Sequence, residues 1–238
     1  MEKLAGILLM AGSSVRFGGP KNKLFCPLNG KPVFTYAIDT FAKQTNISEL
    51  IIVVSKDNME EVQKYIDENK IDATLVLGGE KRQESVRNGL NAVKDLKDDD
   101  IIVVHDAARP LVDAFIINQV AKAADEVGAA TAYLEATDTI AIKNKKDEIT
   151  SFVLRDSVAQ IQTPQAFKFA FLKNAHQWAK DANATDDCSL ILMEGHKVKL
   201  VKGDKKYHKI TRQEDILYLE GLLKQWKSIK SEKSLKAQ

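Results

Sequence analysis

Short apolar runs alternate along the chain with segments in which apolar residues recur at helical spacing. The runs are rich in β-branched and aliphatic residues and are the length of buried strands. We predict strands at residues 5–10, 50–54, 74–77, 101–105, 129–134 and 198–201. Strands that alternate with helices are typical of a mostly parallel sheet flanked by helices. The pattern therefore predicts an α/β fold.

The segments between these runs predict the helices. Apolar residues recur every three or four positions within residues 33–41, 59–66, 86–93 and 116–124. Asp113 and Gly128 have the types expected just before and just after the fourth helix. Thr185 is predicted to cap a further helix ending at Gly195, and Thr211 has capping-box spacing to Glu214 at the start of a last one. Residues 227–238, rich in Lys and Ser, are predicted to fray.

Residues 138–163 interrupt this alternation. Two β-rich runs, 139–142 and 149–154, flank the polar stretch 143–148, which predicts a hairpin that projects from the sheet. A two-stranded hairpin is at best marginally stable alone in water. We therefore expect a partner surface for this arm, and a second copy of the chain is the simplest one, which predicts a homodimer.

Composition narrows the class of protein. With 238 residues, the chain suits a single domain over 1–238, and its net charge of +2 does not predict nucleic acid or a membrane as a partner. No apolar run approaches the roughly 18 residues of a spanning helix, and the apolar start of the chain lacks the cleavage site of a signal peptide. Cys26 and Cys188 have no metal-site spacing, so we expect reduced thiols, no zinc and a cytoplasmic location.

The loop after the first predicted strand carries the first chemical signal. Gly12 and the serines that follow leave backbone N–H groups open to a phosphate, and Arg16 and Lys23 can balance its charge. In parallel sheets, nucleotides bind in the loops that follow the strands. The loop is neither a G-x-G-x-x-G motif nor a P-loop, so it predicts phosphate binding without naming a cofactor.

Other predicted strand ends carry polar loops, within residues 78–85, 105–110, 162–165, 185–187 and 208–211. No Ser/His/Asp or Cys/His pattern indicates a covalent nucleophile. Phosphate-binding cations without a nucleophile favour phosphoryl or nucleotidyl transfer, catalysed by positioning and charge neutralisation. From the residues alone, two simpler interpretations stay open: Arg109 pairs with Asp106 at a helix entrance, and the basic residues form a solvated face.

Taken in order, these motifs resemble the 2-C-methyl-D-erythritol 4-phosphate cytidylyltransferases of the non-mevalonate isoprenoid pathway, which are nucleotidyltransferases with a Rossmann-like fold. The matching segments, spread over residues 5–223, are AGSSVRFG, GGEKRQES, HDAARP, DTI, QTPQAF, TDD and KITRQED. HDAARP followed by QTPQAF is the most specific combination. The resemblance implies that CTP and 2-C-methyl-D-erythritol 4-phosphate give 4-diphosphocytidyl-2-C-methyl-D-erythritol and pyrophosphate, by attack of the substrate phosphate on the α-phosphorus.

The resemblance also implies roles for individual residues. The catalytic cations would be Arg16, Lys23 and Lys209, and Mg²⁺ would bind mainly through the CTP phosphates, with Asp106 as its candidate protein contact. The nucleotide would be bound by Ala11, Gly12, Gly79, Glu80, Ser85 and Asp106. The polyol phosphate would be bound by Asp106 and Arg109, and by Thr139 and Arg155 from the arm of the neighbouring subunit.

The first loop departs from the family pattern, and two alternatives remain. Ser14 stands where the family has a second glycine, and a positive φ there would cost serine about 1–2 kcal/mol. D-ribitol-5-phosphate cytidylyltransferases have a similar fold and also carry QTPQ, so they are the nearest alternative. A regulatory sensor that binds CTP without turnover is the second, and Arg16 with Lys23 disfavours it, because binding alone does not require both.

Overall fold

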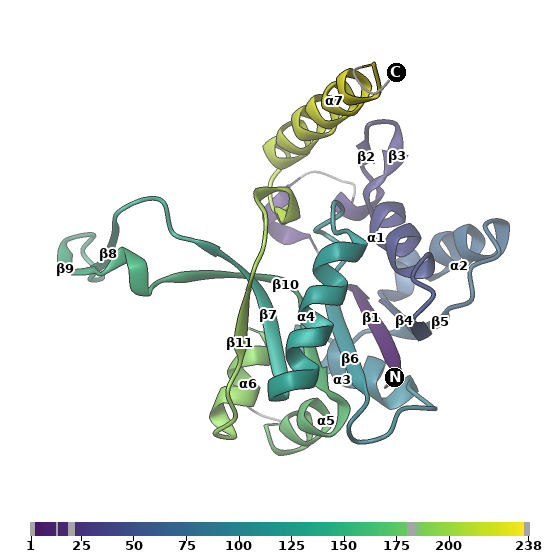
Figure 1. Ribbon diagram of the computed structural model, residues 1–238, viewed down its shortest axis with the longest axis horizontal. Coiled ribbons are helices and arrows are strands. Elements are labelled where there is room, and N and C mark those ends of the chain that lie inside the picture. The colour runs from purple at the N-terminus through teal and green to yellow at the C-terminus, as the bar shows by residue number, and fades with distance from the viewer. Residues whose placement is uncertain (1–2, 13, 19–21, 180–183, 185, 236–238) are drawn as a thin grey trace.

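In the computed structural model, a seven-stranded sheet forms the centre of the protein, in the order β11-β7-β10-β6-β1-β4-β5 (Figure 1). The structure describes residues 3–12, 14–18, 22–179, 184 and 186–235. Every strand runs in the same direction except β10, which is antiparallel to both of its neighbours. With β1 at the centre of β5-β4-β1-β6, the parallel part is Rossmann-like. The predicted fold class is confirmed.

All six predicted strands belong to this sheet. They are β1 (Leu4–Met10), β4 (Ile47–Val54), β5 (Thr74–Leu77), β6 (Ile101–Asp106), β7 (Ala129–Glu135) and β11 (Lys199–Lys202). The seventh, β10 (Ala159–Lys168), was not predicted. Its central residues Gln162, Thr163 and Gln165 are polar yet buried, so its sequence has the composition of a loop. Each of the three has a hydrogen-bond partner, Thr163 within the sheet and the two glutamines outside it, which makes a polar strand acceptable in the core.

The core has two layers, one on each face of the sheet. Alternate residues of β1 face opposite layers: Leu8 and Met10 pack in one, Ala5 and Ile7 in the other. The first layer contains residues of α1 (Val33–Ala42), α2 (Met59–Glu68) and α4 (Ala114–Val127). The second contains residues of α3 (Arg82–Ala92), α5 (Phe169–Trp178) and α6 (Asp187–Met193). Both faces of the sheet are therefore covered, which explains the continuous apolar runs of its strands.

Some helix ends lie where the sequence predicted them, and others do not. The Asp113 carboxylate accepts a hydrogen bond from Ile116 N, 3.1 Å away, and Gly128 ends α4 at φ 96°, as predicted. α6 is capped by Asp186, which accepts from Ser189 N at 3.0 Å; the predicted cap Thr185 lies outside the described residues. α5 was not predicted, nor was the small hairpin of β2 (Pro27–Leu28) and β3 (Lys31–Pro32).

The predicted capping box of the last helix, α7 (Glu214–Leu235), is wrong. The Asp215 carboxylate accepts from the backbone N–H groups of Thr211 and Arg212, each at 2.7 Å. Thr211 donates its hydroxyl to Lys209 O, and Glu214 pairs with Arg212 instead. Asp215 is one residue later in the chain and reaches both donors. α7 continues to Leu235, and fraying of 227–238 stays a prediction.

The predicted arm is confirmed as a separate two-stranded sheet of β8 (Ile140–Lys143) and β9 (Ile149–Val153), which projects away from the central sheet (Figure 1). α7 also extends away from the body. None of the helices in the described part of the chain combines the length and apolar character needed to cross a membrane. Cys26 and Cys188 are free thiols, and the cytoplasmic location inferred from them stays a prediction.

Candidate active site

A cleft of about 490 Å³ lies where β1 and β6 end. These strands are parallel neighbours, so the loops that follow them meet at one edge of the sheet. Segments far apart in the sequence line the cleft. Among the lining residues are all nine that were predicted to act on the nucleotide or at the reaction centre: Ala11, Gly12, Arg16, Lys23, Gly79, Glu80, Ser85, Asp106 and Lys209.

The loop after β1 contains the strained position that the sequence suggested. Ser14 has φ 56° and ψ 23°, in the left-handed region. Its hydroxyl donates to Asn22 Oδ1 at 2.9 Å, and the same oxygen accepts from Leu24 N at 3.1 Å. Asn22 thereby caps the short turn η2 (Lys23–Phe25). The strained serine is thus tied to the turn that carries Lys23.

Lys23 is a cleft cation whose pKa is lowered by its surroundings. Its ammonium donates to Ile210 O at 2.8 Å, so it bridges the first loop and the segment that carries Lys209. Burial and the positive charge of Lys209 lower the pKa of Lys23 to about 8, and Arg16 adds to the effect. An anion in the cleft would relieve this repulsion and raise the pKa again.

Asp106, the last residue of β6, is the central acid. Its Oδ2 lies 2.6 Å from Lys209 Nζ, and its Oδ1 lies 3.5 Å from Arg82 Nε. Burial alone would raise the pKa of this carboxyl, but Lys209, Arg82 and Arg109 outweigh burial and hold the pKa far below its usual value. Asp106 is therefore a fixed negative charge among cations.

The backbone of Asp106 is fixed by the unpredicted strand β10. Thr163 Oγ accepts from Asp106 N at 3.1 Å, which leaves its own proton for His105 Nδ1 at 3.0 Å. His105 Nε2 can then donate to Arg109 O, 3.1 Å away. Burial lowers the pKa of His105 to about 4, which fits the neutral ring that this chain of bonds requires. The HDAARP and QTPQAF segments are thus coupled through hydrogen bonds.

Arg109 lies beside the cleft rather than in its lining. It is largely buried, and its Nη1 donates to Tyr207 O at 2.8 Å. Burial lowers the pKa of Arg109, against the opposing effect of Asp106. Arg109 thereby fixes the segment that leads into Lys209.

The opposite wall is the loop between β5 and α3. The sequence predicted a flexible loop up to Ser85, but α3 begins at Arg82. Glu84 Oε2 accepts from Glu80 N at 2.9 Å, and Ser85 Oγ accepts from Gly79 N at 3.2 Å. A β-carbon on Gly78 would collide with the side chain of Ala11. The glycine lets this wall approach the first loop closely.

Arg82 is a cleft residue to which sequence reasoning gave no role. Its Nη1 donates to Asp187 Oδ2 at 2.8 Å, and both Asp187 and Asp106 raise the pKa of the guanidinium against the effect of burial. Arg82 stood within the GGEKRQES segment, and Asp187 within TDD. Their 105-residue separation hid the pairing, because only the folded chain brings them together.

Thr139 and Arg155 lie on the arm, and neither lines the cleft. Arg155 Nη1 is 3.4 Å from Thr137 O, and Arg155 Nε is 3.9 Å from Asp156 Oδ1. Their predicted contacts with a neighbouring subunit's substrate stay predictions.

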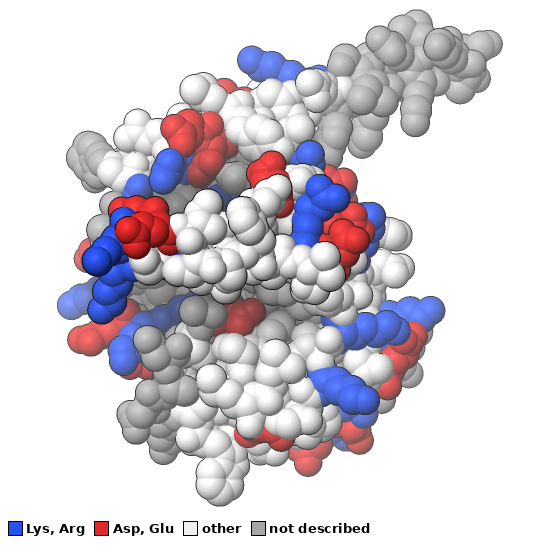
Figure 2. Space-filling view, turned by 90° about the vertical axis from the view of Figure 1, so that its left-hand side faces the viewer, with Lys and Arg blue, Asp and Glu red and all other residues white. Residues whose placement is uncertain are grey.

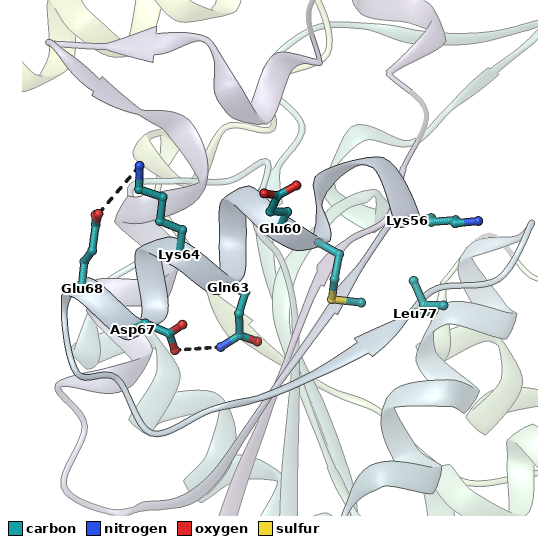
Figure 3. Close-up of a pocket in the computed structure, with 8 residues that line it drawn as sticks. Lys56, Glu60, Gln63, Lys64, Asp67, Glu68 and Leu77 are labelled. Atoms are coloured by element: carbon teal, nitrogen blue, oxygen red, sulfur yellow. Dashed lines mark hydrogen bonds and ion pairs between the residues drawn. The ribbon is translucent and has the colours of Figure 1, made fainter.

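A second hollow, of about 690 Å³, lies on the outer surface of α2 beside Leu77 (Figure 3). Four of its polar side chains bond one another: Lys64 pairs with Glu68 at 3.9 Å, and Gln63 donates to Asp67 at 2.8 Å. Contacts between exposed charges such as these stabilise little. We assign this hollow no function.

Within the described ranges, no group of three or more His, Cys, Asp or Glu side chains is arranged to hold a metal. The site is therefore a small-residue loop, cations from separate segments and one buried carboxylate, at the edge of a Rossmann-like sheet. This combination suits transfer of a nucleotidyl group, in which charge neutralisation replaces a protein nucleophile. Fold and site together define a nucleotidyltransferase.

Comparison with known proteins specifies the family. Residues 4–225 match the family model described as IspD: 2-C-methyl-D-erythritol 4-phosphate cytidylyltransferase. The chain belongs to this family, and it is a cytidylyltransferase. The enzyme of that name from Clostridium tetani is 33% identical over 235 residues, covering 97% of this chain and 94% of that one. The one from Clostridium acetobutylicum is 38% identical over 224 residues, covering 92% and 96%.

Solved structures agree with this assignment. A 4-diphosphocytidyl-2C-methyl-D-erythritol synthase from Anaerococcus prevotii is similar with a TM-score of 0.84 and 26% identity, over 94% of this chain and 96% of that one. A 2-C-methyl-D-erythritol 4-phosphate cytidylyltransferase from Thermus thermophilus has a TM-score of 0.74 and 29% identity, over 93% and 98%.

Proposed function

We propose that this enzyme uses Arg16, Lys23 and Lys209 to hold the triphosphate of CTP while the phosphate of 2-C-methyl-D-erythritol 4-phosphate attacks its α-phosphorus. The observation that carries this proposal is that all three cations line one cleft. The lowered pKa of Lys23, caused by burial and by Lys209, fits a site arranged to receive several negative charges. The cations would stabilise the charge that develops on the α-phosphoryl oxygens.

The reaction needs no protein base. A phosphate oxygen of the polyol phosphate forms a bond to the α-phosphorus, and the bond from that phosphorus to the bridging oxygen of the β-phosphate breaks. The electron pair leaves with pyrophosphate, and the other product is 4-diphosphocytidyl-2-C-methyl-D-erythritol. Because the attacking oxygen carries no proton at neutral pH, the cleft has to supply position and charge.

The loops on either side of the cleft suit the nucleotide. Ala11 and Gly12 would lie along it, and a side chain at Gly12 would meet nothing within 4 Å, so the backbone there is accessible. Gly79, Glu80 and Ser85 would surround the cytosine, on a wall held by the first turn of α3. Its fixed size would favour cytosine over larger bases.

Asp106 would contact the ribose–phosphate region and the polyol phosphate, with Arg109 supporting it from behind. Asp106 lines the cleft, and the nearest cation to its Oδ1 is Arg82 at 3.5 Å, so this oxygen would be the one to face a hydrated Mg²⁺. When bound, the ion would neutralise the triphosphate oxygens, with most of its ligands being phosphate and water.

The arm fits a homodimer in which Thr139 and Arg155 reach the partner's polyol phosphate. Ile142, Phe152 and Leu154 of this arm segment are exposed, an unusual number of large apolar side chains for a free hairpin. Figure 2 views the side from which the arm projects; uncharged residues fill much of the middle of this face, and charged residues lie mostly toward its margins. Such a surface suits association with another protein chain.

The dimer is tested by sedimentation velocity on the wild type and Phe152→Asp. We expect a dimer that the variant dissociates, because the new charge would have to be buried, while Lys146→Asp at the polar tip leaves it intact. Arg155→Ala should raise KM for the polyol phosphate. A monomeric wild type with full activity would remove the arm from the site.

The activity is tested by pyrophosphate release with CTP and each of two polyol phosphates. We expect release with 2-C-methyl-D-erythritol 4-phosphate and none with D-ribitol 5-phosphate. Release with the ribitol compound alone would reverse the choice of substrate. If CTP binds but neither compound supports release, the protein would act as a sensor instead.

A further inference from the structure

Asp187, the first residue of α6, is a buried acid whose two oxygens are both engaged. Only 1% of its surface is exposed. Oδ2 accepts from Arg82 Nη1 at 2.8 Å, and Oδ1 lies 2.9 Å from His176 Nε2. The residue does not line the cleft. Asp187 is thus held from one side by α5 and holds Arg82 on the other.

Arg82 lies between two carboxylates and favours one of them. Its Nη1 is at hydrogen-bond distance from Asp187, whereas its Nε stays 3.5 Å from Asp106 Oδ1. Its Nη2 is buried without a partner among the described residues. A guanidinium can bind one carboxylate through two parallel hydrogen bonds. With Nη1 bonded to Asp187, Arg82 does not bind Asp106 in that way.

The position of Arg82 affects which oxygens of Asp106 can still accept a hydrogen bond from a ligand. Lys209 already occupies Oδ2 at 2.6 Å. If Arg82 moved onto Oδ1, both oxygens of Asp106 would accept from a protein cation, which would leave fewer lone pairs and less negative charge for a ligand. The Nη2 donor, which has no partner among the described residues, would then also turn toward Asp106.

We propose that Asp187 is a positioning residue of the nucleotidyl transfer: it draws Arg82 away from Asp106, so that Asp106 keeps an oxygen, and Arg82 a donor, for the bound nucleotide. This inference rests on the proposed function of the cleft. It assigns Arg82 to the contacts with CTP and gives Asp187 no contact with substrate. His176 fixes the orientation of Asp187 from behind.

A double-mutant cycle tests the coupling. Asp187→Asn, Arg82→Met and the double variant are compared by kcat/KM for CTP. We expect Asp187→Asn to lower kcat/KM about tenfold, and the double variant to be no worse than Arg82→Met, because Asp187 acts only through Arg82. If the two losses multiply, or if Asp187→Asn leaves kcat/KM unchanged, the inference is overturned.

A matched control separates positioning from stability. Asp186→Asn changes the neighbouring carboxylate, which caps α6, and asparagine is an equally good cap. We expect it to keep the wild-type kcat/KM, and thermal unfolding of each variant shows whether a loss follows stability. If Asp187→Asn does not fold, His176→Ala serves instead. His176→Ala should lower kcat/KM for CTP less than Asp187→Asn, and this loss should vanish in the Arg82→Met background. A loss that persists there would contradict the proposal.

A further measurement distinguishes failure of the proposed reaction from failure of the coupling between Asp187 and Arg82. The same cycle is measured by titration calorimetry of CTP binding, without the second substrate. Non-additive losses in CTP affinity would support the coupling even if no polyol phosphate reacted, and additive losses would overturn it. Absence of pyrophosphate release by the wild type would count against the reaction and not against the pairing of Asp187 with Arg82.

Discussion

Lys209 Nζ and Asp106 Oδ2 lie 2.6 Å apart, although 103 residues separate them in the chain. The ion pair joins the end of β6 to the segment before α7, so it fixes two walls of the cleft to each other. It also places a positive charge and a negative charge where the triphosphate and its metal ion would bind. The pair is therefore both a structural link and part of the proposed reaction centre.

Removing either partner should destabilise the protein more than removing both. Lys209→Met leaves a largely buried carboxylate short of one cation, and Asp106→Asn leaves three cations without their shared acid. We expect a coupling free energy of about 0.5–3 kcal/mol in the free energy of unfolding, measured by urea denaturation of both single variants and the double variant. Strictly additive losses would show that the pair contributes nothing to the fold.

The pKa of Lys23 predicts a pH dependence of CTP binding. Burial and Lys209 lower this pKa to about 8 in the free protein, and the triphosphate should raise it. The protonated form binds better, so affinity should be full below about pH 8 and fall as the pH rises through and beyond this value. Proton uptake on binding should appear in calorimetry with buffers of different ionisation enthalpy.

Lys23→Arg is the matched control for that experiment. Arginine stays charged throughout this range, so the variant should lose the decline in affinity that Lys23 causes. If CTP affinity of the variant still declined with rising pH as in the wild type, the decline would be caused by another titrating group.

Ser14 allows a test of backbone strain. At φ 56°, a β-carbon is unfavourable, while the hydroxyl gains a bond to Asn22. Ser14→Ala and Ser14→Gly both lose this bond, but only alanine keeps the β-carbon. We expect the glycine variant to be the more stable of the two by about 0.5–1 kcal/mol, after allowance for the greater backbone entropy of unfolded glycine. Equal free energies of unfolding would show that the loop relaxes around Ser14.

Local signals in the sequence identified most of the fold. Apolar runs predicted six strands, and Asp113 with Gly128 marked the ends of α4, because these features depend on neighbours in the chain. β10 was missed because its buried polar residues find their partners far away in the chain, as Thr163 does with Asp106 and His105. A strand of that kind has no periodic apolar pattern to read.

For the candidate site, too, some features could be predicted from the sequence and others could not. The positions of Arg16 and Lys23 could be expected from the loop after the first strand, and those of Asp106 and Lys209 from the family resemblance. The pairing of Arg82 with Asp187 could not be expected from the sequence, because it depends on how α3 and α6 pack. A sequence contains both residues but not the distance between them.

The most direct test of a cation-lined reaction centre is single-turnover pyrophosphate release by Lys23→Ala, beside its CTP dissociation constant. Loss of one well-placed cation should cost about 2–4 kcal/mol of transition-state stabilisation, which lowers the rate roughly 30- to 1,000-fold. CTP affinity should fall far less, because Arg16 and Lys209 line the same cleft. A wild-type rate, or a loss confined to CTP affinity, would contradict the account.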